Sequence, residues 1–397
     1  MKLSSRMDRV IESQTLAMTK KARELSESGI DVISLSIGEP DFDTPVNICD
    51  EASEAMNRGE THYPPVLGTL NFRKAIQKKL LNENNIKVEL NEIIVSNGAK
   101  HSLFNAIMTL INPGDEVIIP TPYWVSYPAM VQFAQGKVVE IHSKVENEYK
   151  VTAEDLRSKI TDKTKLLMYS SPCNPSGSVL SEQELDAWVE VLKEYPDIMI
   201  ISDEIYEKIN YGEPTKSIGS YEELKGRVAT INGLAKGFAM TGWRIGYMAG
   251  PSEWIKACEK FQGLVSSGSN TIAQAAGIEA MEGDQSEIVK MKQIFETRRD
   301  LMRQLLMDIE GLKVSNPMGA FYHFPDVSHY LGKKTENGSI INTSSDLCLY
   351  LLSDAHVATV AGDAFGNPDC IRLSYATDES IIKKAISQIN ESLKKLL

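Results

Sequence analysis

The most regular feature of the chain is a series of short apolar runs that alternate with helical stretches between Glu92 and Gly250. Several runs are continuous in Val, Ile and Leu, which is typical of strands covered on both faces of a parallel sheet. The stretches between them, such as KHSLFNAIMTLI, have the three-to-four-residue apolar spacing of helices, and Ser181 with Glu184 predicts one helix start. This alternation predicts an α/β domain, with strands in EIIVS, DEVIIP, KVVEI, TKLLMYS, IMIISD, RVATIN and RIGYMAG.

The pattern changes after about Met281, where a long charged helix is followed by the short apolar runs GAFYHFP and CIRLSYA. An amphipathic helix from Glu379 onward closes the chain. This order of elements indicates a smaller α+β unit. The N-terminal region contains a charged helix from Leu16 to Ser26 and one predicted strand, DVISLSIG. We therefore expect a large domain over residues 47–290 and a small domain formed by residues 1–46 and 291–397.

Composition agrees with two folded domains and limits the possible ligands. The chain has 397 residues, 42% of them apolar and 24% charged, which is ordinary for a folded protein with a sizeable core. The 54 acidic residues outnumber the 42 Lys and Arg residues, and the formal net charge is -12. No overall basic field is therefore expected to attract nucleic acid or an anionic membrane, so that local groups must bind any anionic ligand.

Neither a metal centre nor a targeting segment is expected. The five cysteines are scattered without a CxxC pair and the six histidines form no HExxH motif, which favours reduced thiols and no metal site. The N-terminal stretch MKLSSRMDRVIESQTLAM lacks the apolar run of a signal peptide, and no other run is long enough to cross a membrane. We expect a cytoplasmic protein without membrane partners.

Several polar residues directly follow the predicted strands, where open α/β sheets bind their ligands. EIIVS continues into Asn97, Gly98, Ala99 and Lys100 at a helix start, which is either a seat for phosphate or an ordinary turn. After TKLLMYS, Asn174 lies in a loop that two prolines and a glycine constrain. Its amide either donates to a ligand oxygen or forms an Asx-Pro turn.

Asp203 comes at the end of the run IMIISD, where a carboxylate near the low-dielectric end of a sheet requires a cationic partner. The alternative for Asp203 is the N-cap of a helix. Lys236 is the only Lys or Arg between Arg227 and Arg244, and its neighbours are small or apolar. Desolvation there would lower the pKa of the amine and make it nucleophilic, whereas most lysines are simply solvated.

Arg372 lies in CIRLSYA, where the period of a strand places it on the face opposite Ile371, Leu373 and Tyr375. It is either an ion-paired core residue or a fork for a carboxylate. A phosphate seat, an acid, an amide donor and a nucleophilic lysine together fit one cofactor. That cofactor is pyridoxal phosphate, which forms a Schiff base with a lysine and pairs its ring nitrogen with an aspartate.

Six segments, in their order and spacing, resemble a known family: SLSIGEPDFDTP, YWVSYP, SSPCNPSG, SDEIY, AKGFAMTGWRIGY and IRLSYAT. The chain resembles the class I aminotransferases of the pyridoxal phosphate-dependent transferase fold type I over nearly its whole length, and most closely the bacterial aspartate aminotransferases of subgroup Ib. The resemblance implies an α/β fold with a large, mixed but mostly parallel sheet and a smaller α+β domain. It also implies transfer of the amino group of L-aspartate to 2-oxoglutarate, with oxaloacetate and L-glutamate as products.

The resemblance assigns roles around the cofactor. Lys236 would form the Schiff base and then move the proton at the substrate Cα, while Asp203 would pair with the ring nitrogen. Asn174 and Tyr206 would bond the phenolic oxygen, and Trp124 would stack on the ring. The phosphate would be held by Gly98, Ala99, Lys100 and Arg244, and by Tyr63 of the neighbouring subunit in a homodimer with shared active sites. Gly233 stands where many relatives have a phosphate-binding serine.

The resemblance also assigns substrate contacts. Arg372 would bind the α-carboxylate, with help from Asn174, Trp124 and the backbone of Gly38. Lys100 would reach the distal carboxylate of a dicarboxylic substrate, together with the hydroxyls of Ser13 and Thr15. In the alternative, Lys100 only neutralises phosphate, and Ser13 and Thr15 only begin the first helix.

Other activities are compatible with the same cofactor. One alternative is an aminotransferase for prephenate, aromatic or methionine-type substrates, and another is a pyridoxal phosphate-dependent lyase that eliminates a β or γ group. A non-catalytic regulator on this fold is disfavoured, because the chain has no appended basic winged-helix region and retains Lys236. A nicotinamide enzyme is disfavoured because no GxGxxG follows a strand.

Overall fold

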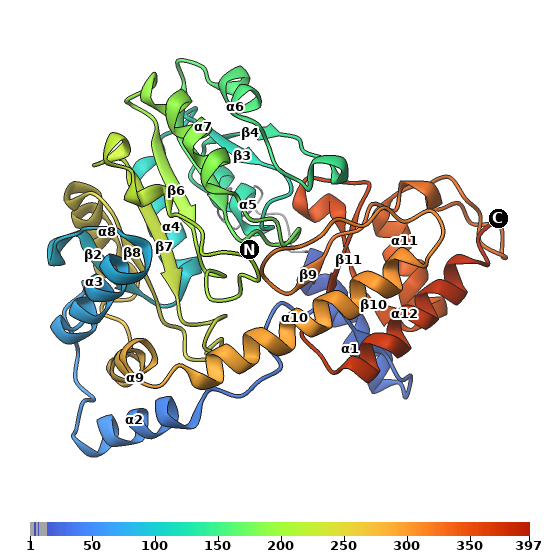
Figure 1. The fold of residues 1–397 in the computed structure, drawn as a ribbon, viewed down its shortest axis with the longest axis horizontal. Coiled ribbons are helices and arrows are strands. Elements are labelled where there is room, and N and C mark those ends of the chain that lie inside the picture. Colours follow the sequence, from blue (N-terminus) through green and yellow to red (C-terminus); the bar gives the residue numbers. More distant parts are fainter. Residues whose placement is uncertain (1–3, 5–6, 8–13) are drawn as a thin grey trace.

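A seven-stranded sheet with strand order β2-β8-β7-β6-β5-β3-β4 forms the middle of the larger part of the molecule, on the left in Figure 1. The computed structural model describes residues 4, 7 and 14–397. Strand β8 is antiparallel to both neighbours, and the other strands pair in parallel. All seven predicted runs are strands of this one sheet: β2 Ile93–Ser96, β3 Glu116–Pro120, β4 Lys137–Ile141, β5 Thr164–Ser170, β6 Met199–Asp203, β7 Val228–Gly233 and β8 Gly246–Ala249. The predicted mixed, mostly parallel sheet is confirmed.

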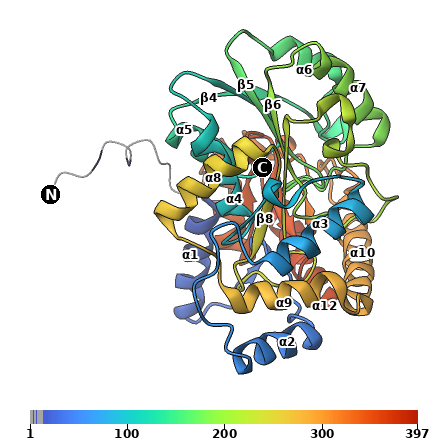
Figure 2. The same ribbon diagram turned by 90° about the vertical axis from the view of Figure 1, so that its left-hand side faces the viewer.

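Helices cover both faces of the sheet because successive strand residues point to opposite sides. Ile119 packs against the layer that contains α4, α5 and α8, whereas its neighbour Ile118 packs against α6 and α7. Helices α3 and α9 cover β2 and β8 on that second face, and Figure 2 shows the two layers on either side of the strands. The helices around the sheet are α2 Val46–Asn57, α3 Leu70–Asn84, α4 Ala99–Leu110, α5 Ser126–Phe133, α6 Ala153–Lys159, α7 Glu182–Lys193, α8 Ser252–Val265 and α9 Thr271–Glu282.

The predicted start of α7 is confirmed by a reciprocal pair of hydrogen bonds. The backbone N–H of Glu184 donates to the Ser181 hydroxyl at 3.3 Å, and the backbone N–H of Ser181 donates to the Glu184 carboxylate at 2.7 Å. These bonds satisfy two donors that would otherwise have no partner at the helix end.

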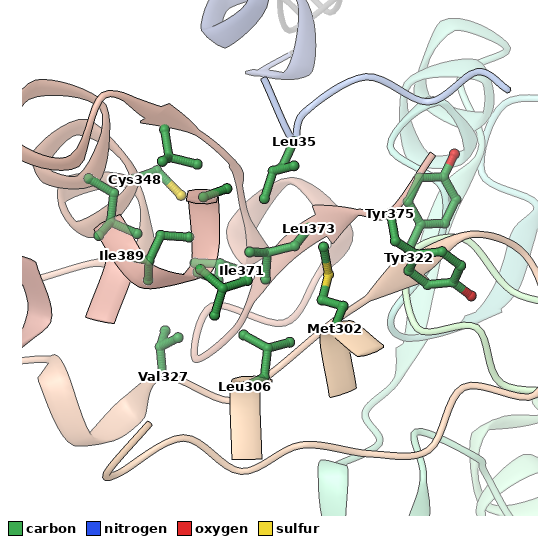
Figure 3. Packing of buried hydrophobic residues seen from close by; sticks show 14 of the residues in the cluster. Leu35, Met302, Leu306, Tyr322, Val327, Cys348, Ile371, Leu373, Tyr375 and Ile389 are labelled. Atoms are coloured by element: carbon green, nitrogen blue, oxygen red, sulfur yellow. The ribbon is translucent and has the colours of Figure 1, made fainter. Parts of the chain in front are cut away.

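The long helix α10 (Ser286–Met307) leads from the sheet domain into a second core, formed mainly by the C-terminal part of the chain (Figure 1). Figure 3 shows this core, in which Met302 and Leu306 of α10 pack against Ile371 and Leu373. The strands here are short: β11 and β9 flank β12 in an antiparallel sheet, and β1 pairs in parallel with β10. The remaining elements are α1 Gln14–Glu27, α11 Ser344–Tyr350, α12 Glu379–Leu393, β1 Ile33–Ser34, β9 Tyr322–His323, β10 Val357–Ala358, β11 Val360–Ala361 and β12 Ile371–Ser374.

The predicted strand DVISLSIG is wrong in its length, because only Ile33 and Ser34 form β1. Leu35 still donates to the carbonyl of Ala358 at 2.9 Å and accepts from the N–H of Ser374 at 2.8 Å. After Leu35 the chain leaves the strands. The carbonyl of Ser36 accepts from Arg372 of β12, and Gly38 and Thr44 then bond to the loop that carries Lys236. The N-terminal segment therefore connects the two cores instead of extending a sheet.

The domain boundaries near residues 46 and 290 stay a prediction. None of the helices in the described part of the chain is long and apolar enough to cross a membrane. Within the same residues, no group of three or more His, Cys, Asp or Glu side chains could hold a metal ion.

Candidate active site

A cavity of about 650 Å³ lies beyond the carboxyl ends of β5 and β6, between the sheet and the C-terminal core. Its wall combines residues from distant parts of the sequence, from the N-terminal segment to β12. Most of the predicted site residues line it: Gly38, Ala99, Lys100, Trp124, Asn174, Asp203, Tyr206, Lys236, Arg244 and Arg372. The structure thus brings together residues that the sequence had placed at separate strand ends.

Asp203, the last residue of β6, is buried in the wall of the cavity. Its Oδ2 accepts a 2.6 Å hydrogen bond from the Tyr127 hydroxyl, and its Oδ1 accepts one of 3.2 Å from the backbone N–H of Ile205. Burial raises the pKa of Asp203 to about 6, although these two bonds and the nearby Lys236 act in the opposite direction. No helix follows directly, so the N-cap alternative for Asp203 is wrong. A buried carboxylate of this kind is ready to pair with a cation in the cavity.

Lys236 lies in the loop after β7, and its Nζ donates a hydrogen bond to the carbonyl of Gly38. Burial, helped by the positive charge of Arg372, lowers the pKa of this amine to about 8. The alternative of a simply solvated lysine is therefore wrong. At pH 7 about a tenth of the amine is therefore unprotonated and able to act as a nucleophile.

Arg372 lies on β12 and is 3% exposed. Its Nη1 donates to Asn174 Oδ1 at 3.0 Å and its Nη2 to the carbonyl of Ser36 at 2.7 Å. Ile371 and Leu373 point into the C-terminal core, as the strand period predicts. Because no carboxylate of the described chain forms an ion pair with Arg372, the alternative of an ion-paired core residue is wrong. Each terminal nitrogen of a guanidinium carries a second N–H, so that the group can still bind an anion.

Two tyrosines that the sequence analysis did not single out belong to this site. Tyr127 holds Asp203, and it lies three residues after Trp124 within the segment YWVSYP, on the inward face of α5. Tyr322 shares a 2.8 Å hydrogen bond with the hydroxyl of Tyr206, and its ring centre lies 4.5 Å from the Arg372 guanidinium. The spacing from Trp124 was a usable signal for Tyr127. Tyr322 had none, since only the fold brings β9 to the cavity.

Tyr206 follows Asp203 by three residues and is buried. The Asn174 side-chain amide donates to its hydroxyl at 3.4 Å. Burial raises the pKa of Tyr206 well above its ordinary value, so this hydroxyl keeps its proton and is available as a hydrogen-bond donor.

The turn between β2 and α4 is shaped to receive an anion. Gly98 has a φ of +86°, and a Cβ there would lie 2.4 Å from Arg244 Nη2. A Cβ at Gly246 would lie 2.4 Å from the backbone nitrogen of Ala99. Only glycines at these positions allow the Arg244 guanidinium to approach the start of α4, where the first N–H groups have no partner within the helix. The cation and the helix start together favour a phosphate.

Close packing against the neighbouring backbone explains why position 233 is a glycine in this chain. A Cβ on Gly233 would lie 2.9 Å from the carbonyl oxygen of Ile245 and 3.0 Å from the Cα of Gly246. Gly233 does not line the cavity, whereas Ala235 does. A serine at position 233 would therefore require the backbone of β8 to shift.

Lys100 lies on the cavity wall, partly open to solvent, with its Nζ 4.7 Å from the ring centre of Trp124. Partial burial lowers the pKa of Lys100, and the charge of Arg244 adds to this effect. Among the described residues, none of the four cations that line the cavity, Lys100, Lys236, Arg244 and Arg372, has an ion-pair partner. The cavity is therefore a place where anionic groups are stabilised.

Among the described residues, the predicted Gly98 and Tyr63 are not part of the cavity lining. Tyr63 is 95% exposed and does not line the cavity of its own chain. Thr15 lies within α1, and Ser13 lies outside the described residues. The predicted roles of Ser13 and Thr15 stay predictions.

Comparison with known proteins agrees with this geometry. The model of the family "Aminotransferase class I and II" matches residues 30–389. A probable aspartate/prephenate aminotransferase of Rhizobium leguminosarum bv. phaseoli is 44% identical and covers 98% of this chain and 97% of its own.

Solved structures are equally similar. The crystal structure of the aspartate aminotransferase from Rhizobium meliloti superposes with a TM-score of 0.97 at 42% identity, over 100% of both chains. The aspartate aminotransferase from Thermus thermophilus with maleate has a TM-score of 0.92 at 38% identity, over 99% of this chain and 100% of its own. With the family match over most of its length and a cavity that gathers the motif residues, the chain belongs to the class I and II aminotransferases.

Proposed function

We propose that the protein transfers the amino group of L-aspartate to 2-oxoglutarate, with pyridoxal phosphate held at Lys236. The observation that carries the proposal is the charge of the cavity, which is lined by four cations without ion-pair partners in the described chain and by two carboxylates, the buried Asp203 and the exposed Glu39. A cofactor with a phosphate and a basic ring nitrogen, together with a dicarboxylic substrate, would complement these charges.

The residues present fit pyridoxal phosphate. The backbone at Gly98, Ala99 and Lys100, with the guanidinium of Arg244, would hold the phosphate, and a Cβ at Gly98 would collide with that guanidinium. Asp203 would pair with the ring nitrogen, while Asn174 and Tyr206 would donate to the phenolic oxygen. Trp124 would cover the ring. When bound, the cofactor supplies a sink for the electron pair that remains at the substrate Cα after its proton is removed.

Lys236 would do the proton chemistry. Of the two lysines in the described chain that line the cavity, Lys236 is the less exposed, and its pKa of about 8 allows both protonation states near neutral pH. A group of this kind can take a proton at the substrate Cα and return it at another atom, because the ideal catalytic pKa lies near the working pH. The carbonyl of Gly38 accepts a hydrogen bond from the Lys236 amine, and both residues line the cavity.

Two cations at separate places in the cavity favour a substrate with two carboxylates. Arg372 would bind the α-carboxylate, supported by Asn174, Trp124 and the backbone of Gly38, and Lys100 would bind the distal one. The names of the relatives from Rhizobium leguminosarum and Rhizobium meliloti support aspartate as the amino donor. Prephenate also carries two carboxylates, and the first of these names includes it, so prephenate is the second candidate acceptor.

Steady-state kinetics with a panel of amino donors tests the substrate. The wild type should use L-aspartate with 2-oxoglutarate at a much higher kcat/KM than leucine or phenylalanine. Lys100→Ala should lower kcat/KM for aspartate about 10- to 1000-fold, the loss of one or a few charge-assisted hydrogen bonds, and leave phenylalanine little changed. An equal loss for both donors would place Lys100 at the cofactor phosphate. Elimination without amino transfer would contradict the proposal.

The site is proposed to be shared within a homodimer. Tyr63, Leu264 and Val265 are 95%, 82% and 58% exposed, and a Cβ at Gly268 would lie 2.7 Å from Pro64, which places these side chains in one region at the end of α8. Exposed apolar side chains gathered in one place are typical of a surface that another protein covers. A second copy of the chain would bury this region and bring its Tyr63 to the phosphate. A cytoplasmic location and the absence of nucleic-acid and membrane partners stay predictions.

A further inference from the structure

The loop that carries Asp203 and Tyr206 into the cavity has a second face, formed by Glu204 and Glu207. Neither glutamate lines the cavity. The carboxylate of Glu204 is buried and accepts hydrogen bonds from Ser217 at 2.5 Å and from Ser202 at 2.9 Å. Along this short segment, Asp203 and Tyr206 therefore line the cavity, whereas Glu204 and Glu207 belong to a separate polar cluster behind it.

Helix α3 closes this cluster with a buried cation. The Lys79 side chain is only 6% exposed, and its Nζ forms an ion pair with Glu207 and donates to Asn84 Oδ1 at 2.8 Å. The Asn84 amide in turn donates to Glu207 at 3.0 Å and to Glu204 at 3.4 Å. The two glutamates of the loop are therefore tied to two residues of α3 that lie more than a hundred positions earlier in the sequence.

Burying charged groups in such a network has a large desolvation free energy, and replacing the network by apolar side chains often stabilises a fold. Removing one partner has the opposite effect, because an uncompensated charge stays in the low-dielectric interior. Hydrogen bonds and ion pairs depend on the distance and direction between their partners, so they fix the position of the loop. Apolar contacts depend less on direction and would allow the loop to shift. The position of the loop matters, since displacing a reacting group by about 1 Å can cost about 100-fold in rate.

We infer that Lys79, with Glu207 and Asn84, is a positioning group that sets the places of Asp203 and Tyr206 from behind the loop. The inference rests on the proposed function, because those two side chains are the ones expected to contact the cofactor ring. None of the three positioning residues lines the cavity. Their effect must therefore pass through the backbone of residues 203–207, in which the carbonyl of Asp203 accepts from the N–H of Ser171 and the N–H of Glu204 donates to the carbonyl of Ile231 in β7.

The inference is tested on the protein loaded with pyridoxal phosphate, with Glu207→Gln and Lys79→Met as variants and Lys79→Arg as the conservative replacement. A hydrogen-bond donor at the phenolic oxygen of the cofactor stabilises the negative charge of that oxygen. If Tyr206 is held less firmly, this stabilisation weakens, and the pKa of the bound cofactor, which is read from its visible absorbance, should rise. We expect the midpoint of the absorbance titration to rise by about half a pH unit or more in Glu207→Gln and Lys79→Met. In the same two variants we expect kcat to fall about 10-fold, with KM for aspartate changed less than about twofold. Lys79→Arg should restore both values toward those of the wild type.

A matched control separates positioning from general loss of stability. Glu116 is also buried and paired with a lysine, Lys137, at 2.9 Å, but it begins β3 at the end of the sheet away from the cavity. Glu116→Gln should lower the unfolding temperature without moving the absorbance midpoint. An unchanged absorbance midpoint in Glu207→Gln, or an equal shift in Glu116→Gln, would overturn the inference. If Lys79→Met does not fold, the result for Glu207→Gln alone decides the test. A wild type that binds no pyridoxal phosphate at Lys236 would instead overturn the proposed function.

Discussion

The hydroxyl of Tyr127 donates a 2.6 Å hydrogen bond to Oδ2 of Asp203, and both side chains are buried beside the cavity. This bond favours the ionised carboxylate, whereas burial raises the pKa of Asp203 to about 6. The tyrosine therefore helps to keep a negative charge where a ring nitrogen would need one.

Tyr127→Phe should weaken that charge without removing the carboxylate. We expect the half-reaction with aspartate to slow about 10- to 150-fold, since a hydrogen bond to a charged group contributes about 1.5–3 kcal/mol. Single-turnover absorbance measurements would show it. Tyr123→Phe is the matched control, because Tyr123 also donates to a carboxylate, that of Glu140 at 2.7 Å, but does not line the cavity. Equal effects of the two substitutions would contradict this role of Tyr127.

The lowered pKa of Lys236 makes a prediction about cofactor capture. Only the neutral amine reacts with an aldehyde, and with a pKa of about 8 the neutral fraction rises through pH 8 and levels off above it. Capture of pyridoxal phosphate by the cofactor-free protein should be about 10-fold slower at pH 7 than on the plateau. Arg372→Gln should move the midpoint upward, because the positive charge of Arg372 lowers this pKa. A midpoint near 10.5 in the wild type would show that the amine is fully solvated.

Asp203 should cost the cofactor-free protein stability. Its pKa is about 6 in the folded chain and 3.8 in an ordinary environment, so the folded state holds the proton more tightly. This group therefore contributes stability at low pH, and that stability is lost as the pH rises from about 4 to about 6.

Asp203→Asn removes that dependence, so the variant should gain stability over the wild type through this window and keep a constant advantage above pH 6. The expected advantage is about 1–3 kcal/mol, which urea unfolding at pH 4, 5, 6 and 8 would measure. A variant less stable than the wild type at pH 8 would show that the burial cost is already offset in the folded state. The cofactor affinity of the variant should fall at the same time, because the ring nitrogen loses its charge partner.

Much of this site could be predicted from the sequence because strand ends are local signals. Asp203 and Asn174 each follow a continuous apolar run, and such residues meet at one edge of a parallel sheet whatever the rest of the fold does. The side of Arg372 followed from the period of a strand. These predictions needed no knowledge of which elements pack together.

The parts that were missed depend on tertiary packing. Tyr322 reaches Tyr206 only because the C-terminal core packs against the sheet, and the early end of β1 reflects bonds from the segment after Leu35 to the loop of Lys236. The buried cluster around Lys79 could not be predicted from the sequence either, since a lysine in a helix is usually solvated. Contacts between distant segments leave no pattern in either one alone.

The proposed homodimer is tested by mixing inactive subunits. Lys236→Ala and Arg244→Ala remove groups that lie in the same cavity of one chain, whereas Tyr63→Ala removes a group expected to serve the partner. After dissociation and reassociation, Tyr63→Ala should partly restore activity to Lys236→Ala, and Arg244→Ala should not. Sedimentation of a monomer, with no rescue by either variant, would contradict shared sites.

The central claim is that Lys236 is the residue that carries pyridoxal phosphate. Borohydride reduction of the loaded protein makes that attachment permanent, and peptide mapping by mass spectrometry then locates it. We predict a pyridoxyl label on Lys236 and none in Lys236→Ala. A label on Lys100 or on any other lysine, with Lys236 unmodified, would contradict the account.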